Sequence, residues 1–191
     1  MTTIRPETLA DIAARESLLD FAFGDCRYSK TAERLREGRL PAQGLSFVAS
    51  EDGRVVGSVR LWEILAGPAH PALLLGPLAV ACDSQRRGVG AALVQHVLGE
   101  AKRLGHKSML LVGDAPYYGR FGFSMKKTDR LWLPGPFERE RLLGLELAPG
   151  ALAGAHGSIA AAGRLAPKCD LAALLAAHLT RGASTATPHA A

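Results

Sequence analysis

A basic turn with two glycines is the stretch of this sequence best suited to binding chemistry. It reads QRRGVG at residues 85–90, after an apolar run at 75–81 and before apolar residues at helical spacing up to residue 104. The first turn of a helix has backbone N–H groups without intrahelical acceptors and a partial positive charge. Glycines let the main chain approach a ligand closely, and Arg86 and Arg87 add formal positive charge. The turn is therefore expected to bind a phosphate or diphosphate.

Two common phosphate-binding motifs do not fit this turn. The dinucleotide fingerprint GxGxxG needs a third small residue at position 93, which is Leu93. The nucleotide P-loop ends in Gly-Lys-Ser/Thr, and no such tripeptide follows. Taken alone, the hexapeptide is also compatible with a plain helix start that has a solvated basic face.

A second segment, GDAPYYGRFGF at residues 113–123, makes the interpretation more specific. The pattern QxxGxG resembles the acetyl-CoA signature of the GCN5-related N-acetyltransferases, the GNAT superfamily. Tyr118, four residues before Gly122, matches that family's other landmark, YxxxGF. The hairpin-like DGRVVGSVRL at residues 52–61 is similar to the one that precedes the family's cofactor strand, and the wording of residues 113–123 resembles the YhbS-type branch. The resemblance covers about residues 4 to 148.

The resemblance implies an α/β GNAT fold. Its central sheet is mixed and mostly antiparallel, has one parallel βαβ pair that splays to bind acetyl-CoA, and carries helices on both faces. The activity implied is direct transfer of an acetyl group from acetyl-CoA to an amine, without a metal. Main-chain groups of the central strand would hold the pantetheine arm, and the tyrosine hydroxyl would protonate the departing sulfur. The implied donor-binding residues are Leu78, Ala79, Val80, Gln85, Arg86, Arg87, Gly88, Val89, Gly90, Ala91 and Tyr118.

The catalytic acid and base are expected at separate positions. A phenol with a reference pKa of about 10 stays protonated at neutral pH and can protonate a thiolate whose conjugate acid has a pKa of about 8.5. Tyr118 is the predicted general acid. The alternative role for Tyr118 is packing against the pantetheine, and Tyr117 would then be the next candidate for the acid. An attacking amine must also lose a proton, and Glu63, near the end of a predicted strand, is the candidate base. Glu63 is alternatively a solvated carboxylate without a catalytic role, and Glu51, Asp52 or His70 could then serve as the base through water. Cys82 is interpreted as a small packing residue rather than a nucleophile.

The surrounding pattern predicts the elements that position these residues. Strands are expected at 45–50 and 54–65, joined by an Asp-Gly turn, and at 106–112, 123–127 and 142–147. Thr8 and Asp11 form a weak capping box for the first helix, and a second, charged helix is expected at 29–39. By resemblance these two helices form a wall of the acceptor pocket. The apolar loop 131–137, with Trp132 and Phe137, is left open between lining that pocket, a homodimer contact and packing on the core.

Composition limits the remaining possibilities. The 191 residues are 48% hydrophobic and 21% charged, which is typical of one soluble domain, expected at 1–148. An alanine- and glycine-rich extension follows at 149–191, with one short helix at 171–179 and a frayed end. No apolar run reaches the roughly 20 residues of a membrane helix. The amino terminus lacks a signal core, and three scattered cysteines favour a reducing cytoplasm.

The net charge of +5 suits an anionic ligand such as coenzyme A. Nucleic acid is disfavoured because the basic residues are scattered and no aromatic-basic stripe appears. A non-catalytic acyl-CoA sensor stays open as the rival function. The length of the transferred acyl group and the identity of the acceptor, a small-molecule or peptide amine, also stay open.

Overall fold

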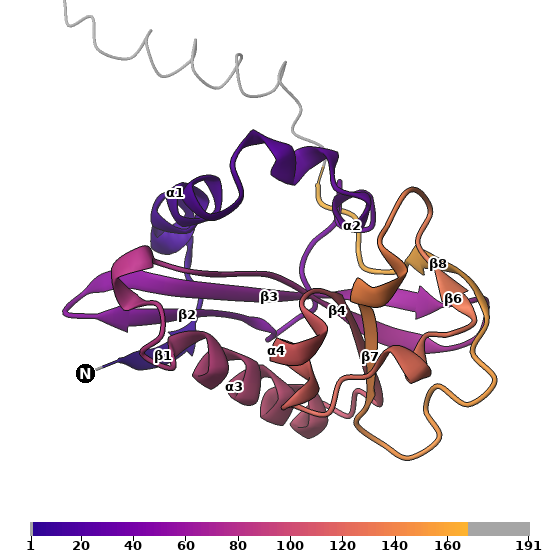
Figure 1. Ribbon diagram of the computed structural model, residues 1–191. Helices are drawn as coiled ribbons and strands as arrows, with labels where there is room; N and C mark the ends of the chain where they lie inside the picture. Colours follow the sequence, from indigo (N-terminus) through magenta and orange to yellow (C-terminus); the bar gives the residue numbers. More distant parts are fainter. Residues whose placement is uncertain (1, 168–191) are drawn as a thin grey trace, which may run out of the picture.

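The computed structural model describes residues 2–167, which form one twisted sheet with helices on both faces (Figure 1). Along the sheet the order is β1 (Thr3–Pro6), β2 (Ser46–Glu51), β3 (Arg54–Ala66), β4 (Pro71–Val80), β5 (Ser108–Val112) and β7 (Leu142–Glu146). Neighbours β4 and β5 are parallel, and the other neighbouring pairs on this path are antiparallel. The expected mixed, mostly antiparallel sheet is confirmed.

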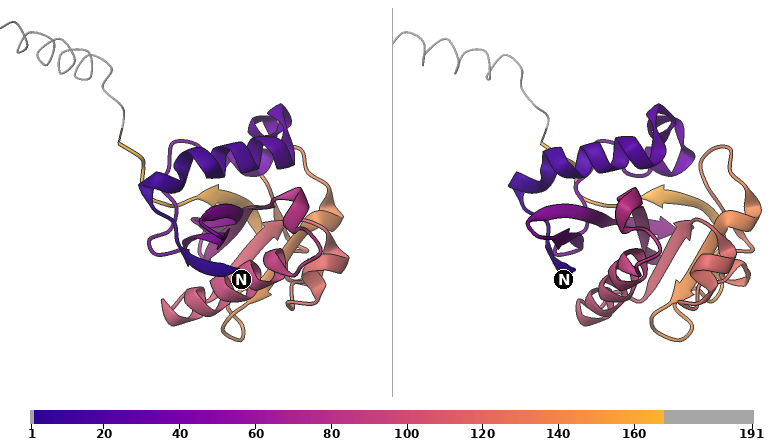
Figure 2. Two further views of the ribbon diagram at one scale, coloured as in Figure 1. Left: turned by 90° about the vertical axis from the view of Figure 1, so that its left-hand side faces the viewer. Right: turned by 60° about the vertical axis from the view of Figure 1, so that its left-hand side comes forward.

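The helices cover the two faces unequally. On one face lies α3 (Val89–Arg103), whose apolar seam is buried against the sheet at Val89, Leu93, Val97 and Ala101. Leu104, also part of the predicted seam, is 41% exposed just beyond the helix end. On the opposite face, α1 (Ile12–Phe23), η2 (Asp25–Ser29) and α2 (Thr31–Arg34) run across the sheet (Figure 2). We call residues 12–36, which include the turn after α2, the arch.

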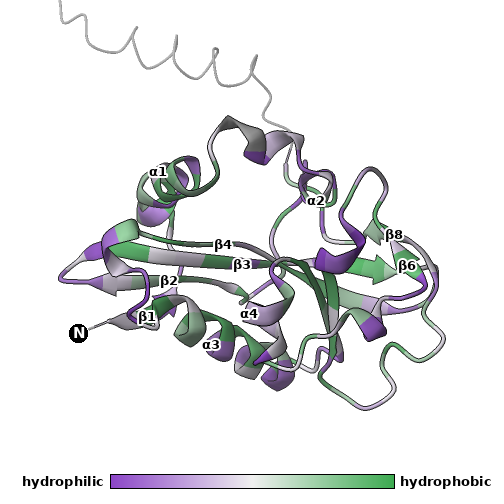
Figure 3. Ribbon diagram, viewed as in Figure 1, coloured by the Kyte–Doolittle hydropathy of each residue, from purple (hydrophilic) through white to green (hydrophobic). Residues whose placement is uncertain are grey.

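Hydropathy follows this layering. Apolar residues fill the central strands, whereas polar residues alternate with them along the helices (Figure 3). All of β5 is buried except the partly buried Val112, as expected for a strand whose two faces are both covered: Met109 and Leu111 pack on one face and Leu110 on the other. Among the helices formed by residues 2–167, none has the length and apolar composition that a membrane-spanning segment needs.

The capping box that the sequence predicts is at the 3-10 turn that leads into α1. Asp11, in the short 3-10 turn η1 (Leu9–Asp11), accepts from the Thr8 N–H at 2.8 Å and from both Nη atoms of Arg5 at 2.7 Å. The hydrogen bond from Arg5 is the main cause that holds the pKa of the Asp11 carboxyl well below its usual range. The chain is thereby fixed as it leaves β1 for the arch.

Three segments differ from the sequence prediction. The helix expected at 29–39 is shorter, because α2 ends at Arg34 and residues 35–38 form turns. In these turns the Glu33 carbonyl accepts from the N–H groups of both Arg36 and Glu37, and Gly38 has a positive φ. The prediction of a strand at 123–127 is wrong. Only Ser124 bridges β7, and its side chain then caps the 3-10 turn η4 (Met125–Lys127).

The third difference is an unpredicted strand after residue 149. β8 (Gly157–Ala161) pairs antiparallel with the end of β3 and parallel with β6 (Leu131–Trp132). Its Ile159 is buried in the core. The short helix predicted at 171–179 lies outside the described residues.

Candidate active site

The centre of the site is the place where β4 and β5 separate. Their register ends after Leu73 opposite Met109 and Leu74 opposite Leu110, while β4 continues to Val80. On its other edge β4 stays paired with β3. The β5-facing edge of β4 is therefore open over residues 75–80, as the βαβ resemblance implies.

Strand alternation shows which main-chain groups face this gap. The Ala81 N–H donates to the Val56 carbonyl at 2.8 Å, and Ala79 lies opposite Ser58 in the same antiparallel register. Main-chain groups of Ala79 are thus directed to β3, and those of Leu78 and Val80 to the gap. Gln85 closes the turn that follows, because its Nε2 donates to the Val80 carbonyl at 3.2 Å.

The two glycines of the basic turn serve different purposes. Gly88 is the N-cap of α3 with φ +84°, a left-handed conformation, and a Cβ there would meet no atom within 4 Å. A Cβ on Gly90 would lie 3.0 Å from the Tyr117 hydroxyl and 3.4 Å from Val80. The first glycine is required by the backbone conformation, whereas the second makes room for the Tyr117 hydroxyl and Val80, so the main chain is exposed at Gly88 and partly covered at Gly90.

Positive charge surrounds this helix start. Arg86 is exposed and has φ +61°. Arg87 is also exposed and forms an ion pair with Glu51, with Nη1 and Oε2 3.0 Å apart. Val89 is buried beneath the turn, and Ala91 belongs to the first helical turn. Residues 86–91, which we call the cradle, thus combine N–H groups with guanidinium charge, an arrangement that can bind an anion.

Tyr118 lies on the short helix α4 (Ala115–Gly119), which follows β5 directly. Asp114 caps this helix by accepting from the Tyr117 N–H at 3.0 Å. The Tyr118 ring packs edge-on against Tyr117 and Phe123. A Cβ on Gly113 would come 2.3 Å from the Tyr118 ring, so only glycine leaves room for it. Burial raises the pKa of Tyr118 to about 12.

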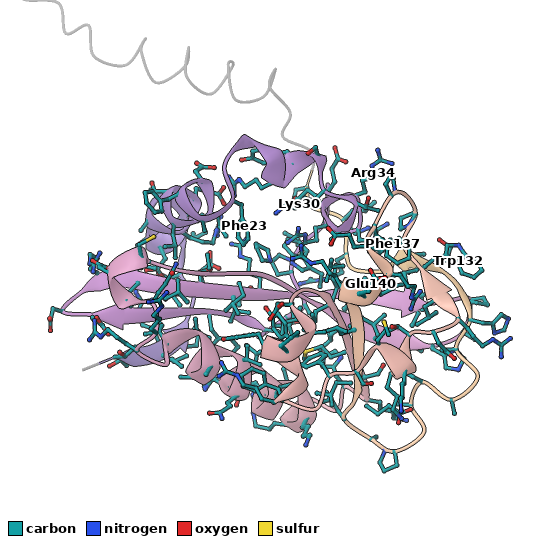
Figure 4. All side chains as sticks on the ribbon, in the orientation of Figure 1. Phe23, Lys30, Arg34, Trp132, Phe137 and Glu140 are labelled. Carbon is teal, nitrogen blue, oxygen red and sulfur yellow. The ribbon has the colours of Figure 1, made fainter. Side chains whose placement is uncertain are left out.

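A cavity of about 770 Å³ lies between the arch and the sheet. Its walls are the arch, residues 74–78 of β4, the end of β5 with Tyr118, and the loop 133–141. Figure 4 shows Phe23 and Lys30 beneath the arch, with Phe137 below α2. Leu78 and Tyr118 both line the cavity, so it adjoins the open edge of β4.

The candidate bases lie elsewhere. Glu63, Glu51, Asp52 and His70 are not among the cavity-lining residues. Side chains alternate along β3, and because the neighbouring Trp62 lines the cavity, Glu63 is directed to the other face of the strand.

Other predicted residues are divided between the cavity and the surface. Phe137 lines the cavity, whereas Trp132 does not line it and is 51% exposed. Cys82 is exposed with a free thiol in η3 (Cys82–Ser84). No group of three or more His, Cys, Asp or Glu residues that could hold a metal ion occurs within residues 2–167.

The sequence prediction missed the cationic residues of the cavity wall. Arg27, Lys30 and Arg36 come from the arch, and Arg60 from β3. Arg60 is held by Glu7, with Nε and Oε2 2.7 Å apart. Their scattered positions form no motif, and only the folding of the arch over β4 brings them together.

Comparison with known proteins places these features in a family. The family model described as "Acetyltransferase (GNAT) family" matches residues 11–123. The uncharacterized N-acetyltransferase YhbS of Escherichia coli K12 is 31% identical over 160 residues, which cover 82% of this chain and 93% of YhbS. YjhQ of the same organism, also an uncharacterized N-acetyltransferase, is 29% identical over 119 residues, 61% of this chain and 65% of YjhQ.

Solved structures agree with this assignment. The crystal structure of E. coli YhbS in complex with CoA has a TM-score of 0.72 and 28% identity, covering 84% of this chain and 89% of that one. A GNAT acetyltransferase from Brucella melitensis in complex with acetyl-CoA has a TM-score of 0.60 and 29% identity, covering 78% and 90%. The splayed strands, the glycine cradle and the matches together establish that the chain belongs to the acetyltransferase (GNAT) family.

Proposed function

We propose that this N-acetyltransferase transfers the acetyl group of acetyl-CoA directly to a primary amine held in the cavity under the arch. The observation that carries the proposal is the position of β4. Its carboxyl end leads into the cradle at residues 86–91, and its open edge adjoins the cavity lined by Tyr118. A donor bound along this edge has its diphosphate at one end and its thioester beside the acceptor.

The donor is held mainly by main-chain groups. The cradle binds the diphosphate, and the gap-facing groups of Leu78 and Val80 bind the pantetheine arm and the thioester carbonyl. The Leu78 N–H is the oxyanion donor, because Leu78 also lines the cavity. Ala79, predicted as a third contact, contributes by keeping this part of β4 paired with β3.

Tyr118 is the general acid. The amine nitrogen bonds to the thioester carbon, the carbon–sulfur bond breaks, and the phenolic proton goes to the departing sulfur. A pKa of about 12 keeps the hydroxyl protonated at any physiological pH, as an acid must be. The ring is held in place by Gly113 and Phe123, so the hydroxyl position is fixed before the substrate binds.

The nitrogen, which becomes positively charged when it attacks, loses its proton to water in the cavity, and water returns a proton to the Tyr118 phenolate. Glu63, the predicted base, is on the face of β3 opposite to the cavity-lining Trp62, so in this mechanism it makes no direct contact with the amine. Glu63→Gln is therefore expected to keep kcat/KM within about threefold of wild type, well short of the 10²-fold or more that a general base contributes. A loss of that larger size would restore Glu63 as the base.

The activity is tested by incubating the protein with acetyl-CoA and a panel of primary amines. Free thiol and the mass of the acetylated product are measured, with Tyr118→Phe as the matched control. Thiol release that depends on both amine and Tyr118 is expected. CoA binding without thiol release on any amine would overturn the proposal in favour of a non-catalytic acyl-CoA sensor.

A further inference from the structure

Two buried arginines of the arch, Arg27 and Arg36, line the cavity with donors that the protein does not satisfy. The Arg36 side chain is 9% exposed and that of Arg27 12%. The Nε atom of each is buried and has no hydrogen-bond partner within the part of the chain that the structure describes. Buried polar groups are nearly always hydrogen-bonded, so two such donors on one cavity wall indicate a missing acceptor.

The other end of each guanidinium is already occupied. Arg27 Nη2 is 2.5 Å from Glu16 and 2.9 Å from Asp20, and Arg36 Nη2 is 2.8 Å from Glu33. These carboxylates fix the two side chains in the cavity wall, and each Nε is itself covered, so a ligand contacts it only after a side-chain shift. Fixed guanidinium groups bind carboxylates and phosphates with good geometry and little further ordering.

The cations of the cavity wall are only partly paired. Six Arg and Lys side chains and four carboxylates line it, and Arg27 and Arg60 also pair with Asp20 and Glu7, which lie outside the lining. Lys30 has no carboxylate partner among the described residues, and its Nζ lies 4.7 Å from the centre of the Phe23 ring. Burial lowers the pKa of Arg36, and the nearby charge of Arg27 adds to this. An anion bound in the cavity would favour the charged form of Arg36, which burial disfavours.

We infer that the acceptor is a small amine that also carries a carboxylate or a phosphate, and that Arg27, Arg36 and Lys30 bind this anionic group under the arch. The inference rests on the proposed function and names its acceptor class. A cavity of about 770 Å³ matches a small molecule, and the anion contact would orient the amine toward Leu78 and Tyr118. Polyamines and aminoglycosides are disfavoured, because their additional ammonium groups would face the arginines.

The test uses acceptor pairs that differ only in the anionic group. An amino acid is compared with its amide, and O-phosphoethanolamine with ethanolamine, in a thiol-release assay with acetyl-CoA. The acidic member of at least one pair is expected to have a kcat/KM about 10- to 100-fold higher, the effect of one or two charge-assisted hydrogen bonds. The pair with the larger ratio distinguishes carboxylate from phosphate.

Variants locate the contact. Arg36→Gln and Lys30→Gln should raise KM for the acidic acceptor about tenfold or more, change KM for its neutral counterpart less than twofold, and leave CoA affinity unchanged. Arg103→Gln removes the same charge from the outer surface of α3, where Arg103 pairs with Glu100, and should behave like wild type. Lys30 is exposed, so its variant keeps the test valid if Arg36→Gln does not fold.

Calorimetry of each acceptor with the CoA-bound protein separates this inference from the proposed function. Thiol release at equal rates for acidic and neutral acceptors would overturn the inference and leave the function intact. Tighter binding of acidic acceptors without any turnover would support the site and overturn the function. If Arg36→Gln weakens CoA as much as the acceptor, the anion belongs to the donor and the inference fails.

Discussion

Replacing Tyr118 by phenylalanine removes one oxygen atom and keeps the ring that packs against Tyr117 and Phe123. A general acid contributes about 10²- to 10⁴-fold to a rate. With its pKa raised to about 12, the Tyr118 hydroxyl is a weaker acid than a free phenol. This pKa is about 3.5 above that of a reference thiol, so moving the proton from the phenol to a thiolate costs about 5 kcal/mol. A weak acid contributes less, so kcat is expected to fall about 10²-fold, at the lower end of the range.

The assay measures kcat from thiol release and CoA affinity from calorimetry. Affinity should stay within about threefold, because general-acid catalysis acts on the reaction step rather than on donor binding. Tyr117→Phe is the matched control. If kcat falls in that variant and not in Tyr118→Phe, Tyr117 is the general acid and Tyr118 is not. Because the acid must be protonated, wild-type kcat should show no fall caused by Tyr118 below about pH 11. A fall near about pH 9 that disappears in Tyr118→Phe would refute the buried-phenol argument.

Three further predictions concern backbone and stability. Gly90→Ala places a Cβ 3.0 Å from the Tyr117 hydroxyl and 3.4 Å from Val80, and this crowding of about 1–3 kcal/mol is expected to shift these neighbours and weaken CoA binding up to about 150-fold. Gly88→Ala is expected to lower the free energy of unfolding by about 1–2 kcal/mol through its positive φ. Calorimetry and thermal unfolding distinguish the two effects, and unchanged CoA affinity in Gly90→Ala would show that the positions of Tyr117 and Val80 do not matter for the donor. Gly113→Ala should displace the Tyr118 ring and lower kcat with CoA affinity retained; wild-type turnover would mean that the ring position is not critical. Asp11→Asn should lower the free energy of unfolding at pH 7 by about 1–2 kcal/mol. Because the pKa of Asp11 is depressed in the folded protein, its carboxylate stabilises the fold above about pH 4, and this stabilisation is lost as pH falls. The difference in free energy of unfolding between Asp11→Asn and wild type should therefore shrink in acid. A difference that does not change with pH would contradict this.

The donor side of the site was accessible to sequence reasoning because it is local. The cradle depends on consecutive residues, where glycines, arginines and a helix start are visible as a pattern, and Tyr118 follows from a short motif. The parallel pairing of β4 with β5 follows from the strand–helix–strand order. These features need no information about distant parts of the chain, so the central sheet with its strand–helix–strand unit and the glycine turn at the start of α3 were predictable, and donor binding by that turn stays a prediction.

The proposed acceptor side depends on contacts between distant segments. Arg27 and Arg36 face the cavity only because the arch crosses β4, and their helical spacing does not encode this. Glu63 looked suitable as a carboxylate near a strand end, but the face to which it points depends on the pairing of β3, including an irregularity between Val59 and Leu61. β8 was missed because Gly157–Ala161 is short, and its pairing with β3 is not visible locally.

The strands β7 and β8 have a practical consequence for anyone shortening this chain. The family match ends at residue 123, yet β7 covers the outer edge of β5, and β8 pairs with Ile64, Leu65 and Ala66 of β3. A fragment cut at the end of the match would leave two sets of unpaired backbone donors and acceptors and remove Ile159 from the core. Bare strand edges invite pairing between molecules, so such a fragment is expected to aggregate, whereas one extended through residue 167 retains both strands.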